Sequence, residues 1–361
     1  MTYPSQAGPG LPLSAFGWTP NQAASFRSTF PALEPGRVLA ASRGLALVRT
    51  ETGETLASPS GRLRQRLQAE DLLLCAGDWL ALEPQPGGGR ALVHDLLPRG
   101  PRLARQEAGP GGRAQVLAAN LDVVFLVMGL DRNFNPGRME RLLALAGAGG
   151  VRPVILLTKR DLNPQAEALR ARMEDLAPGV PVLTLATPAG EGLPEARAFL
   201  PPGATGALVG SSGAGKSTLL NALMGGTVNR AQAVRESDDR GRHTTTAREL
   251  FLLPGGGCLI DTPGIREVGL CGGEDLDGPF GEVAALAAAC RYRDCAHGAE
   301  PGCAVRAALA SGALDEGRYQ RYLRLRRESA FEEARADARL WRERDEKWKR
   351  IGKLQKQMRK R

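Results

Sequence analysis

Residues 208–218 read LVGSSGAGKST, and Gly210–Ser217 within this stretch match the pattern GxxxxGK[ST] in full. An apolar run (ALV) precedes the loop and a helical pattern (TLLNAL) follows it, which is the context that the motif requires. Glycines let backbone amides approach phosphate oxygens, and the start of a helix adds a favourable field. The stretch predicts a nucleotide-phosphate site formed by Gly210, Ser211, Ser212, Gly213, Ala214, Gly215, Lys216, Ser217 and Thr218, with Lys216 on the β- and γ-phosphates and Ser217 on Mg²⁺.

The region around this loop alternates between strand and helix patterns. Apolar runs such as LDVVFLVMGL (121–130) and VPVLTLAT (180–187) are separated by helical stretches such as QAEALRARMEDLA (165–177). Alternation of this kind is typical of a mainly parallel sheet with helices on both faces. We therefore predict an α/β P-loop domain.

LLTKRDL at residues 156–162 resembles a guanine-reading loop. Asp161 can accept hydrogen bonds from guanine N1–H and N2–H, a pattern that adenine lacks, and the stem of Lys159 can cover the base. Thr158 stands where the pattern NKxD has asparagine. A second loop, ATPAGEGL at 186–193, also follows a strand and is expected to approach the base.

Two segments downstream of the phosphate loop have the character of nucleotide switches. DTPG begins at Asp261 after the strand CLI, where the carboxylate can hold Mg²⁺ through water and the amide of Gly264 can sense the γ-phosphate. GRHTTT at 241–246 lies in a polar stretch, and we expect Thr245 to complete the Mg²⁺ shell when GTP is bound. The base loops thus precede the phosphate loop, which indicates a circularly permuted GTPase domain.

Three of the six cysteines and one of the three histidines lie within fourteen residues, in the pattern Cys-x4-Cys-x-His-x5-Cys. Three thiolates and an imidazole form a closed tetrahedral zinc site with no position for a catalytic water. The alternative is a group of buried free cysteines near a surface histidine. We predict one structural zinc ion per chain, held by Cys290, Cys295, His297 and Cys303.

The two ends of the chain differ in composition. Residues 1–36 are rich in Pro, Gly and Ser and predict a flexible leader, whereas residues 37–98 carry about five short strand patterns with turn residues between them. This pattern suits a small barrel such as an OB-fold, a fold that often binds nucleic acid, although a merely structural barrel is also consistent with it. Trp79 is the one obvious candidate for an exposed, base-stacking aromatic side chain.

Charge is concentrated at the C-terminal end. The net charge is +9, and residues 341–361 contribute +7 of it through ten basic and three acidic residues. A polyanion such as nucleic acid is the expected partner, the alternative being a solvated helical tail. We expect a leader at 1–36, an OB-fold RNA-binding domain at 37–105, the permuted GTPase domain at 106–278, and a mainly helical zinc-binding domain with the basic tail at 279–361.

Length and composition exclude several classes. The 361 residues suffice for two to four domains, and the longest near-apolar run, Val123–Leu130, is much shorter than the roughly 20 residues of a membrane helix. The first basic residue is Arg27, after a start rich in Gly and Pro, so no signal peptide is recognisable. A cytoplasmic protein without a membrane partner is the expectation.

Taken in order, TKRD, GSSGAGKST, GRHTTT, DTPGIRE and CRYRDCAHGAEPGC resemble the RsgA (YjeQ) family of circularly permuted GTPases of the small ribosomal subunit. The resemblance covers roughly residues 37–335, including a barrel that contains GDW. It implies an N-terminal OB-fold, binding of GTP and GDP with Mg²⁺, and action on the 30S subunit and its 16S rRNA during late maturation. It also implies subunit-stimulated GTP hydrolysis that releases the factor. We expect a monomer.

The identity of the group that positions the attacking water stays open. Ras-like enzymes place a glutamine just after DxxG, but Ile265 occupies that place here and cannot orient water. His243 is one candidate for a catalytic role, beside Lys216 and Thr245; a ribosomal group is another, and His243 as a solvated loop residue is the third reading. Two other functions are consistent with parts of the sequence. One is an RNA-binding scaffold regulated by guanine-nucleotide occupancy with little hydrolysis; the other is an ATP-using P-loop kinase, against which Asp161 and DTPG argue.

Overall fold

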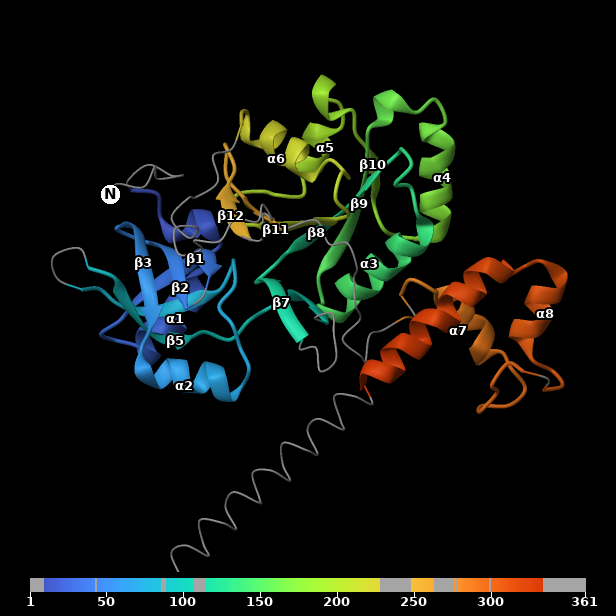
Figure 1. Cartoon of the computed structure of the whole chain (residues 1–361), viewed down its shortest axis with the longest axis horizontal. Helices are drawn as coiled ribbons and strands as arrows, with labels where there is room; N and C mark the ends of the chain where they lie inside the picture. Colours follow the sequence, from blue (N-terminus) through green and yellow to red (C-terminus); the bar gives the residue numbers. More distant parts are fainter. Residues whose placement is uncertain are drawn as a thin grey trace, which may run out of the picture. The chain divides into compact units, whose positions relative to one another are not determined.

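The computed structural model describes residues 10–42, 44–85, 89–106, 114–227, 248–262, 276, 278–298 and 300–333. The chain folds as two compact units, residues 1–268 and residues 269–361 (Figure 1). None of the helices in the described part of the chain is both long and apolar enough to span a bilayer.

Five strands near the N-terminus close into a small barrel. β1 pairs antiparallel with β2 and with β4, β2 pairs with β3, and a parallel pair of β3 with β5 and an antiparallel pair of β5 with β4 complete the ring. The helix α2 lies between β3 and β4 in the chain. The predicted barrel of the OB-fold class is confirmed, with β1 at Glu34–Ser42, β2 at Leu45–Thr50, β3 at Gly53–Pro59, α2 at Gly61–Ala69, β4 at Trp79–Glu83 and β5 at Ala91–Leu96.

A second group of strands forms the predicted parallel sheet. Its order is β10-β9-β8-β11-β13-β12, and each neighbouring pair is parallel except β12 with β13. β12 also pairs with β1 of the barrel, so both parts share one continuous sheet. The strands are β8 (Val123–Gly129), β9 (Arg152–Thr158), β10 (Val182–Thr184), β11 (Thr205–Gly210), β12 (Glu249–Leu252) and β13 (Cys258–Asp261).

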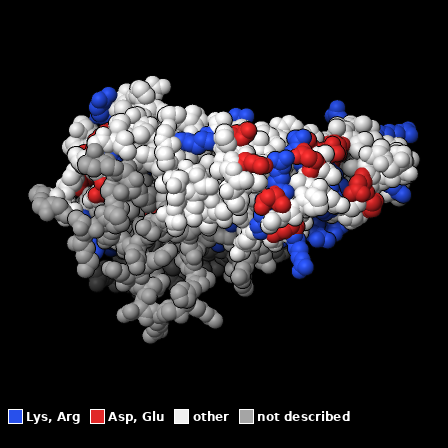
Figure 2. Space-filling view, turned by 90° about the horizontal axis from the view of Figure 1, so that it is seen from above, with Lys and Arg blue, Asp and Glu red and all other residues white. Residues whose placement is uncertain are grey.

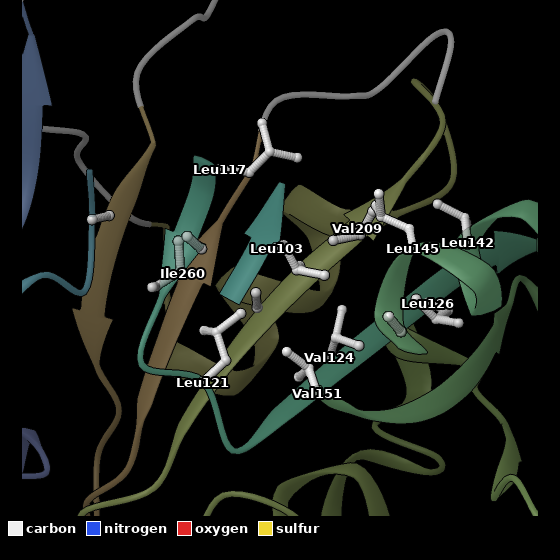
Figure 3. Close-up of a cluster of buried hydrophobic side chains, with 14 of the residues drawn as sticks. Leu103, Leu117, Leu121, Val124, Leu126, Leu142, Leu145, Val151, Val209 and Ile260 are labelled. Carbon is white, nitrogen blue, oxygen red and sulfur yellow. The ribbon is translucent and has the colours of Figure 1, made fainter. Parts of the chain in front are cut away.

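Helices and a hairpin cover this sheet. The apolar run Val123–Gly129 is buried throughout, and its side chains alternate between the two hydrophobic clusters of the sheet. Figure 3 shows one cluster, where Leu103 and Leu117 of the hairpin point toward Val124 and Val209. The covering elements are the hairpin strands β6 (Arg102–Gln106) and β7 (Ala114–Ala119), and the helices α3 (Pro136–Ala148), α4 (Ala166–Leu176), α5 (Leu193–Arg197) and α6 (Lys216–Met224).

Residues expected to lie in a flexible leader instead form two helices, η1 (Leu13–Phe16) and α1 (Pro20–Thr29). The Thr19 hydroxyl accepts from the Gln22 amide at 3.3 Å, and the Gln22 side chain accepts from the Thr19 amide at 2.9 Å. This reciprocal capping fixes the start of α1. Leu13 and Phe16 are buried, so the segment is part of the core of the first unit.

The GDW motif turns out to be structural. Trp79, the expected base-stacking residue, is only 2% exposed, and its ring lies 4.5 Å from that of Trp18. The Asp78 carboxylate is buried and accepts from the Arg99 guanidinium at 2.7 and 2.8 Å. A Cβ at Gly77 would overlap the Ala119 carbonyl oxygen. The expectation of an exposed Trp79 is therefore wrong, because Trp18, between η1 and α1, packs on it.

The second unit is mainly helical, as predicted. α7 (Gly281–Ala288) contacts α8 (Ala304–Ser311), and a further helix covers residues 316–333. The ring of Phe280 lies 5.4 Å from that of Tyr322, and the Arg318 guanidinium pairs with Glu282. These contacts join the last described helix to the start of α7.

Basic and acidic side chains are interspersed on the face shown in Figure 2. Among the described residues, ion pairs such as Arg170–Glu174, at 2.6 Å, neutralise part of the charge. The excess of positive charge is instead concentrated in residues 341–361 of the sequence, which lie outside the described residues.

Candidate functional site

The phosphate loop lies between β11 and α6. Gly213 and Gly215 have φ values of +76° and +91°, a conformation that favours glycine. A Cβ at Gly210 would overlap the carbonyl oxygen of Val127 on the neighbouring strand β8. Each motif glycine therefore has a backbone or packing reason, while Ser212, Ser217 and Thr218 are exposed at the loop and first helical turn.

Lys216 begins α6 and is 7% exposed. Its Nζ donates to the carbonyl oxygens of Gly210 at 2.8 Å and Ser211 at 3.0 Å. The ammonium group thus lies against the loop that the sequence assigns to phosphate binding. Ala214, in the same loop, is fully buried.

Parallel pairing brings the other predicted loops to the same edge of the sheet. Thr158 at the end of β9 is in register with Gly129 of β8, and Asp261 of β13 is in register with Leu208 of β11. The Thr262 hydroxyl donates to the Leu208 carbonyl oxygen at 2.6 Å, which fixes the start of DTPG beside β11.

The base loop contacts the phosphate loop directly. The Thr158 hydroxyl donates to the Ala214 carbonyl oxygen at 2.6 Å, and Lys159 Nζ donates to the Gly213 carbonyl oxygen at 2.7 Å. Thr158 is 1% exposed, and Lys159 has a left-handed φ of +64°. The two loops, about fifty residues apart in sequence, are therefore joined by side-chain hydrogen bonds.

Asp161 lies in the short helix η2 (Arg160–Leu162) and is exposed, as a base-binding carboxylate requires. The Arg160 amide donates to the Leu185 carbonyl oxygen at 3.1 Å, and Asn163 Nδ2 donates to the Leu130 carbonyl oxygen at 2.7 Å. These bonds tie η2 to its neighbours on both sides.

The second predicted base loop, residues 186–193, contains the helical turn η3 (Thr187–Ala189) and lies beside the first. Glu191 pairs with Arg160 at 2.9 Å. A Cβ at Gly192 would lie 2.5 Å from the Thr184 carbonyl oxygen, so glycine is required for this tight turn.

Sequence reasoning missed two polar residues at this edge. Asp131 and Asn133 follow β8; Asp131 Oδ2 accepts from Lys159 Nζ at 2.6 Å, and Asp131 Oδ1 accepts from the Asn133 amide at 2.9 Å. Partial burial opposes ionisation of Asp131, but the hydrogen bonds from Lys159 and Asn133 outweigh it and lower its pKa. A polar residue two positions after a fully buried strand is the signal that was present in the sequence.

His243, Thr245 and Gly264 lie outside the described residues. Their predicted roles stay predictions.

The four predicted zinc ligands form one group in the second unit. Their ligand atoms all lie within 4.8 Å of one another. The Sγ atoms of Cys290 and Cys303 each lie 3.5 Å from His297 Nδ1 and 3.9 Å from each other. A tetrahedral ion with bonds of about 2.0–2.3 Å requires ligand separations of this size. The group therefore fits a zinc ion.

Local contacts act on two of these four ligands. Cys303 caps α8, and its sulfur accepts from the Arg306 amide at 3.4 Å. Burial and the neighbouring thiols of Cys303 and Cys290 raise the pKa of Cys295 to about 11. A nearby cation would reverse this effect, since three adjacent sulfurs ionise together only when a positive charge compensates them.

Together these features define a P-loop nucleotide-binding protein whose base loop enters from an earlier strand, and which carries a Cys3His group after the switch region. The sequence profile of the family described as RsgA GTPase matches residues 96–271. A protein of Opitutus terrae named small ribosomal subunit biogenesis GTPase RsgA is 43% identical over 352 residues, which cover 94% of this chain and 96% of that protein. The chain belongs to the RsgA GTPase family.

Two solved structures share the fold of this chain. The crystal structure of YjeQ from Thermotoga maritima has a TM-score of 0.60 and 25% identity, covering 82% of this chain and 98% of that one. The structure of YloQ, titled a circularly permuted GTPase, shares the fold with a TM-score of 0.56 and 21% identity, covering 82% of this chain and 95% of that one. The predicted permuted fold is confirmed.

Proposed function

We propose that this protein is a GTPase that binds the 30S ribosomal subunit during late maturation and couples subunit-stimulated GTP hydrolysis to its own release. The relatives' name, which refers to biogenesis of the small ribosomal subunit, supports the partner. The observation that carries the nucleotide assignment is the docking of the base loop onto the phosphate loop through Thr158 and Lys159.

Guanine specificity would come from the exposed carboxylate of Asp161. It can accept two hydrogen bonds from guanine, while the stem of Lys159 covers one face of the base. Thr158 donates its single hydroxyl hydrogen to Ala214, so its role is to join the two loops rather than to contact the base. Lys216 and the amides of residues 210–218 would bind the phosphates.

Mg²⁺ would be held by Ser217, by Thr245 and, through water, by Asp261. When bound it neutralises charge that develops on the phosphate oxygens. The side chain of Ser217 stands in the first turn of α6, and Asp261 ends the strand next to β11, so the described candidates lie at one edge of the sheet. His243, or a group of the ribosome, would orient the attacking water.

One zinc ion per chain would have a structural role in the second unit. The four side chains Cys290, Cys295, His297 and Cys303 would supply all four ligands of the ion, which would leave no position for a substrate. The ion would hold the loop between α7 and α8 in a fixed shape.

The contact with 16S rRNA would be made by the barrel, residues 37–105, and by the basic segment at 341–361. Lys and Arg release counterions from a nucleic-acid backbone, so this contact weakens as salt rises. We propose that the protein acts as a monomer in the cytoplasm and does not engage a membrane.

The decisive experiment measures GTP turnover by the purified full-length protein alone and with purified 30S, 50S and 70S particles. The expected result is that 30S particles stimulate GTP turnover strongly, and more than 50S or 70S particles do. Binding to 30S particles without stimulated turnover would instead favour the RNA-binding scaffold. Competition between GTP and ATP in the same assay tests the guanine assignment, since effective displacement by ATP would favour the kinase alternative.

A further inference from the structure

Asp131 lies beside the base loop but belongs to none of the nucleotide-binding motifs in the sequence. We infer that Asp131 is a positioning residue that fixes Lys159 over the guanine base, and so lengthens the lifetime of the bound nucleotide. The inference deepens the proposed function and rests on it, because it assigns a partner to the side chain that covers the base.

The first argument is the geometry of the pair. Lys159 Nζ has two acceptors at short distance, Asp131 Oδ2 at 2.6 Å and the Gly213 carbonyl oxygen at 2.7 Å. The side chains of the pair are 28% and 31% exposed, so it is partly screened from solvent. A lysine stem has several rotatable bonds, and two fixed acceptors at its end restrict it to one path across the site.

The second argument is that Asp131 is itself held in place. The Asn133 backbone amide donates to its Oδ1 at 2.9 Å, and Oδ2 accepts from Lys159 Nζ at 2.6 Å and, at the longer distance of 3.4 Å, from Asn133 Nδ2. A Cβ at Gly129 would lie 2.9 Å from Asp131 Oδ1, so the glycine provides the space that the carboxylate occupies. Asp131 is therefore a fixed acceptor rather than a mobile surface charge.

The third argument is the position of Lys159 between two loops. Its backbone directly follows β9 in a left-handed conformation, and its Nζ contacts the phosphate loop. The Gly213 carbonyl alone would anchor the end of the side chain at one point. Asp131, which follows β8, supplies the second point, so that the stem is already held beside the position of the base before the nucleotide arrives.

The test uses the full chain and fluorescent GDP, with dissociation followed by stopped flow. Asp131→Asn keeps the shape of the side chain and removes its charge. Loss of one partly buried charged hydrogen bond predicts a rise in the dissociation rate of about 3–10-fold. Glu174→Gln is the matched control, because Glu174 pairs with Arg170 on the exposed face of α4, and it should leave the rate unchanged.

A double-mutant cycle separates positioning from support of the loop. Lys159→Met keeps an unbranched stem but removes the ammonium group, so Asp131→Asn should have no further effect in that background. An equal effect of Asp131→Asn in both backgrounds would overturn the inference, because it would show that Asp131 acts through Asn133 or the fold. So would unchanged dissociation from Asp131→Asn alone.

Two further measurements separate failure of this inference from misfolding of the variant and from failure of the proposed function. The unfolding temperature of Asp131→Asn should stay close to that of the unsubstituted protein. If it falls sharply, the same cycle is run with Asp131→Glu in place of Asp131→Asn: faster dissociation in the unsubstituted protein and no further effect in Lys159→Met support the inference, and an equal effect in both backgrounds overturns it. Asp161→Ala tests the proposed function separately, since it should abolish the preference for GDP over ADP. If Asp161→Ala keeps that preference, the base-loop assignment fails and the inference fails with it; if only Asp131 is silent, the inference alone fails.

Discussion

Truncation of Trp18 to alanine tests whether the N-terminal segment is part of the core. The Trp18 side chain is 9% exposed, with its ring 4.5 Å from Trp79 and 5.8 Å from Phe26 in an edge-on arrangement. Removal of a buried aromatic side chain costs about 3–5 kcal/mol. For a unit of more than 200 residues, each kcal/mol lowers the unfolding temperature by about 2–4 °C, so the unfolding temperature of the first unit should fall by about 6–20 °C.

Far-UV circular dichroism during heating of the full-length protein measures this shift. Leu11→Ala is the matched control, because Leu11 precedes the same helices but is 36% exposed, and it should change the free energy of unfolding by about 0.5 kcal/mol or less. If Trp18→Ala shifts the transition no more than Leu11→Ala does, the segment is not a structural part of the first unit. That result would refute the packing argument for Trp79 as well.

Four other predictions concern the site and its surroundings. His243→Ala should lower 30S-stimulated turnover while GTP affinity stays the same, and full stimulated turnover would exclude His243 as the water-positioning group. Deletion of residues 341–361 should weaken binding to 30S particles and reduce its salt dependence, whereas equal affinity at every salt concentration would exclude the tail. Metal analysis should find about one zinc per chain, and much less in Cys303→Ser, in which one of four ligands is lost. Burial raises the pKa of Cys258 from 9.0 to about 12, so the stability that this thiol contributes is complete below pH 9 and lost between pH 9 and 12. The free energy of unfolding, measured with urea, should therefore decline less over that range in Cys258→Ala than in the unsubstituted protein.

Local patterns in the sequence were sufficient for the parallel sheet, the phosphate loop and the zinc group. The run at Val123–Gly129 is apolar at every position but its last, and such a run can only be a buried element. Cys290 and Cys303 are close enough along the chain that a single loop brings them together. Features of this kind depend on neighbours in sequence, so their prediction needs no knowledge of the tertiary structure.

The N-terminal helices and the role of Trp79 could not be predicted in this way. Thr19 and Gln22 form a recognisable capping box, but α1 is polar along most of its length and buries only Phe26. The segment is ordered because Trp18 packs on Trp79, which lies far along the chain. The burial of Trp79 depends on the same contact, so one missed element led to both errors.

Asp131 shows a different limit of sequence reasoning. Its partner, Lys159, is 28 residues away, and the two meet because β8 and β9 pair with Gly129 opposite Thr158. The sequence places a polar residue at the end of each strand but does not fix the register between them. Only that register decides which of the polar residues touch.

The same register explains why a changed order of loops leaves the nucleotide site intact. β9, β8, β11 and β13 are hydrogen-bonded side by side and run in parallel, so their carboxyl ends meet at one edge whatever the order in which the chain visits them. The contacts that join the base loop to the phosphate loop come from Thr158 and Lys159, and they depend on this edge and not on the connection between the strands. A permutation therefore changes only what is attached to the sheet. Here the barrel joins through β1 and β12, and the Cys3His unit comes later in the chain, after the segment that begins at Asp261.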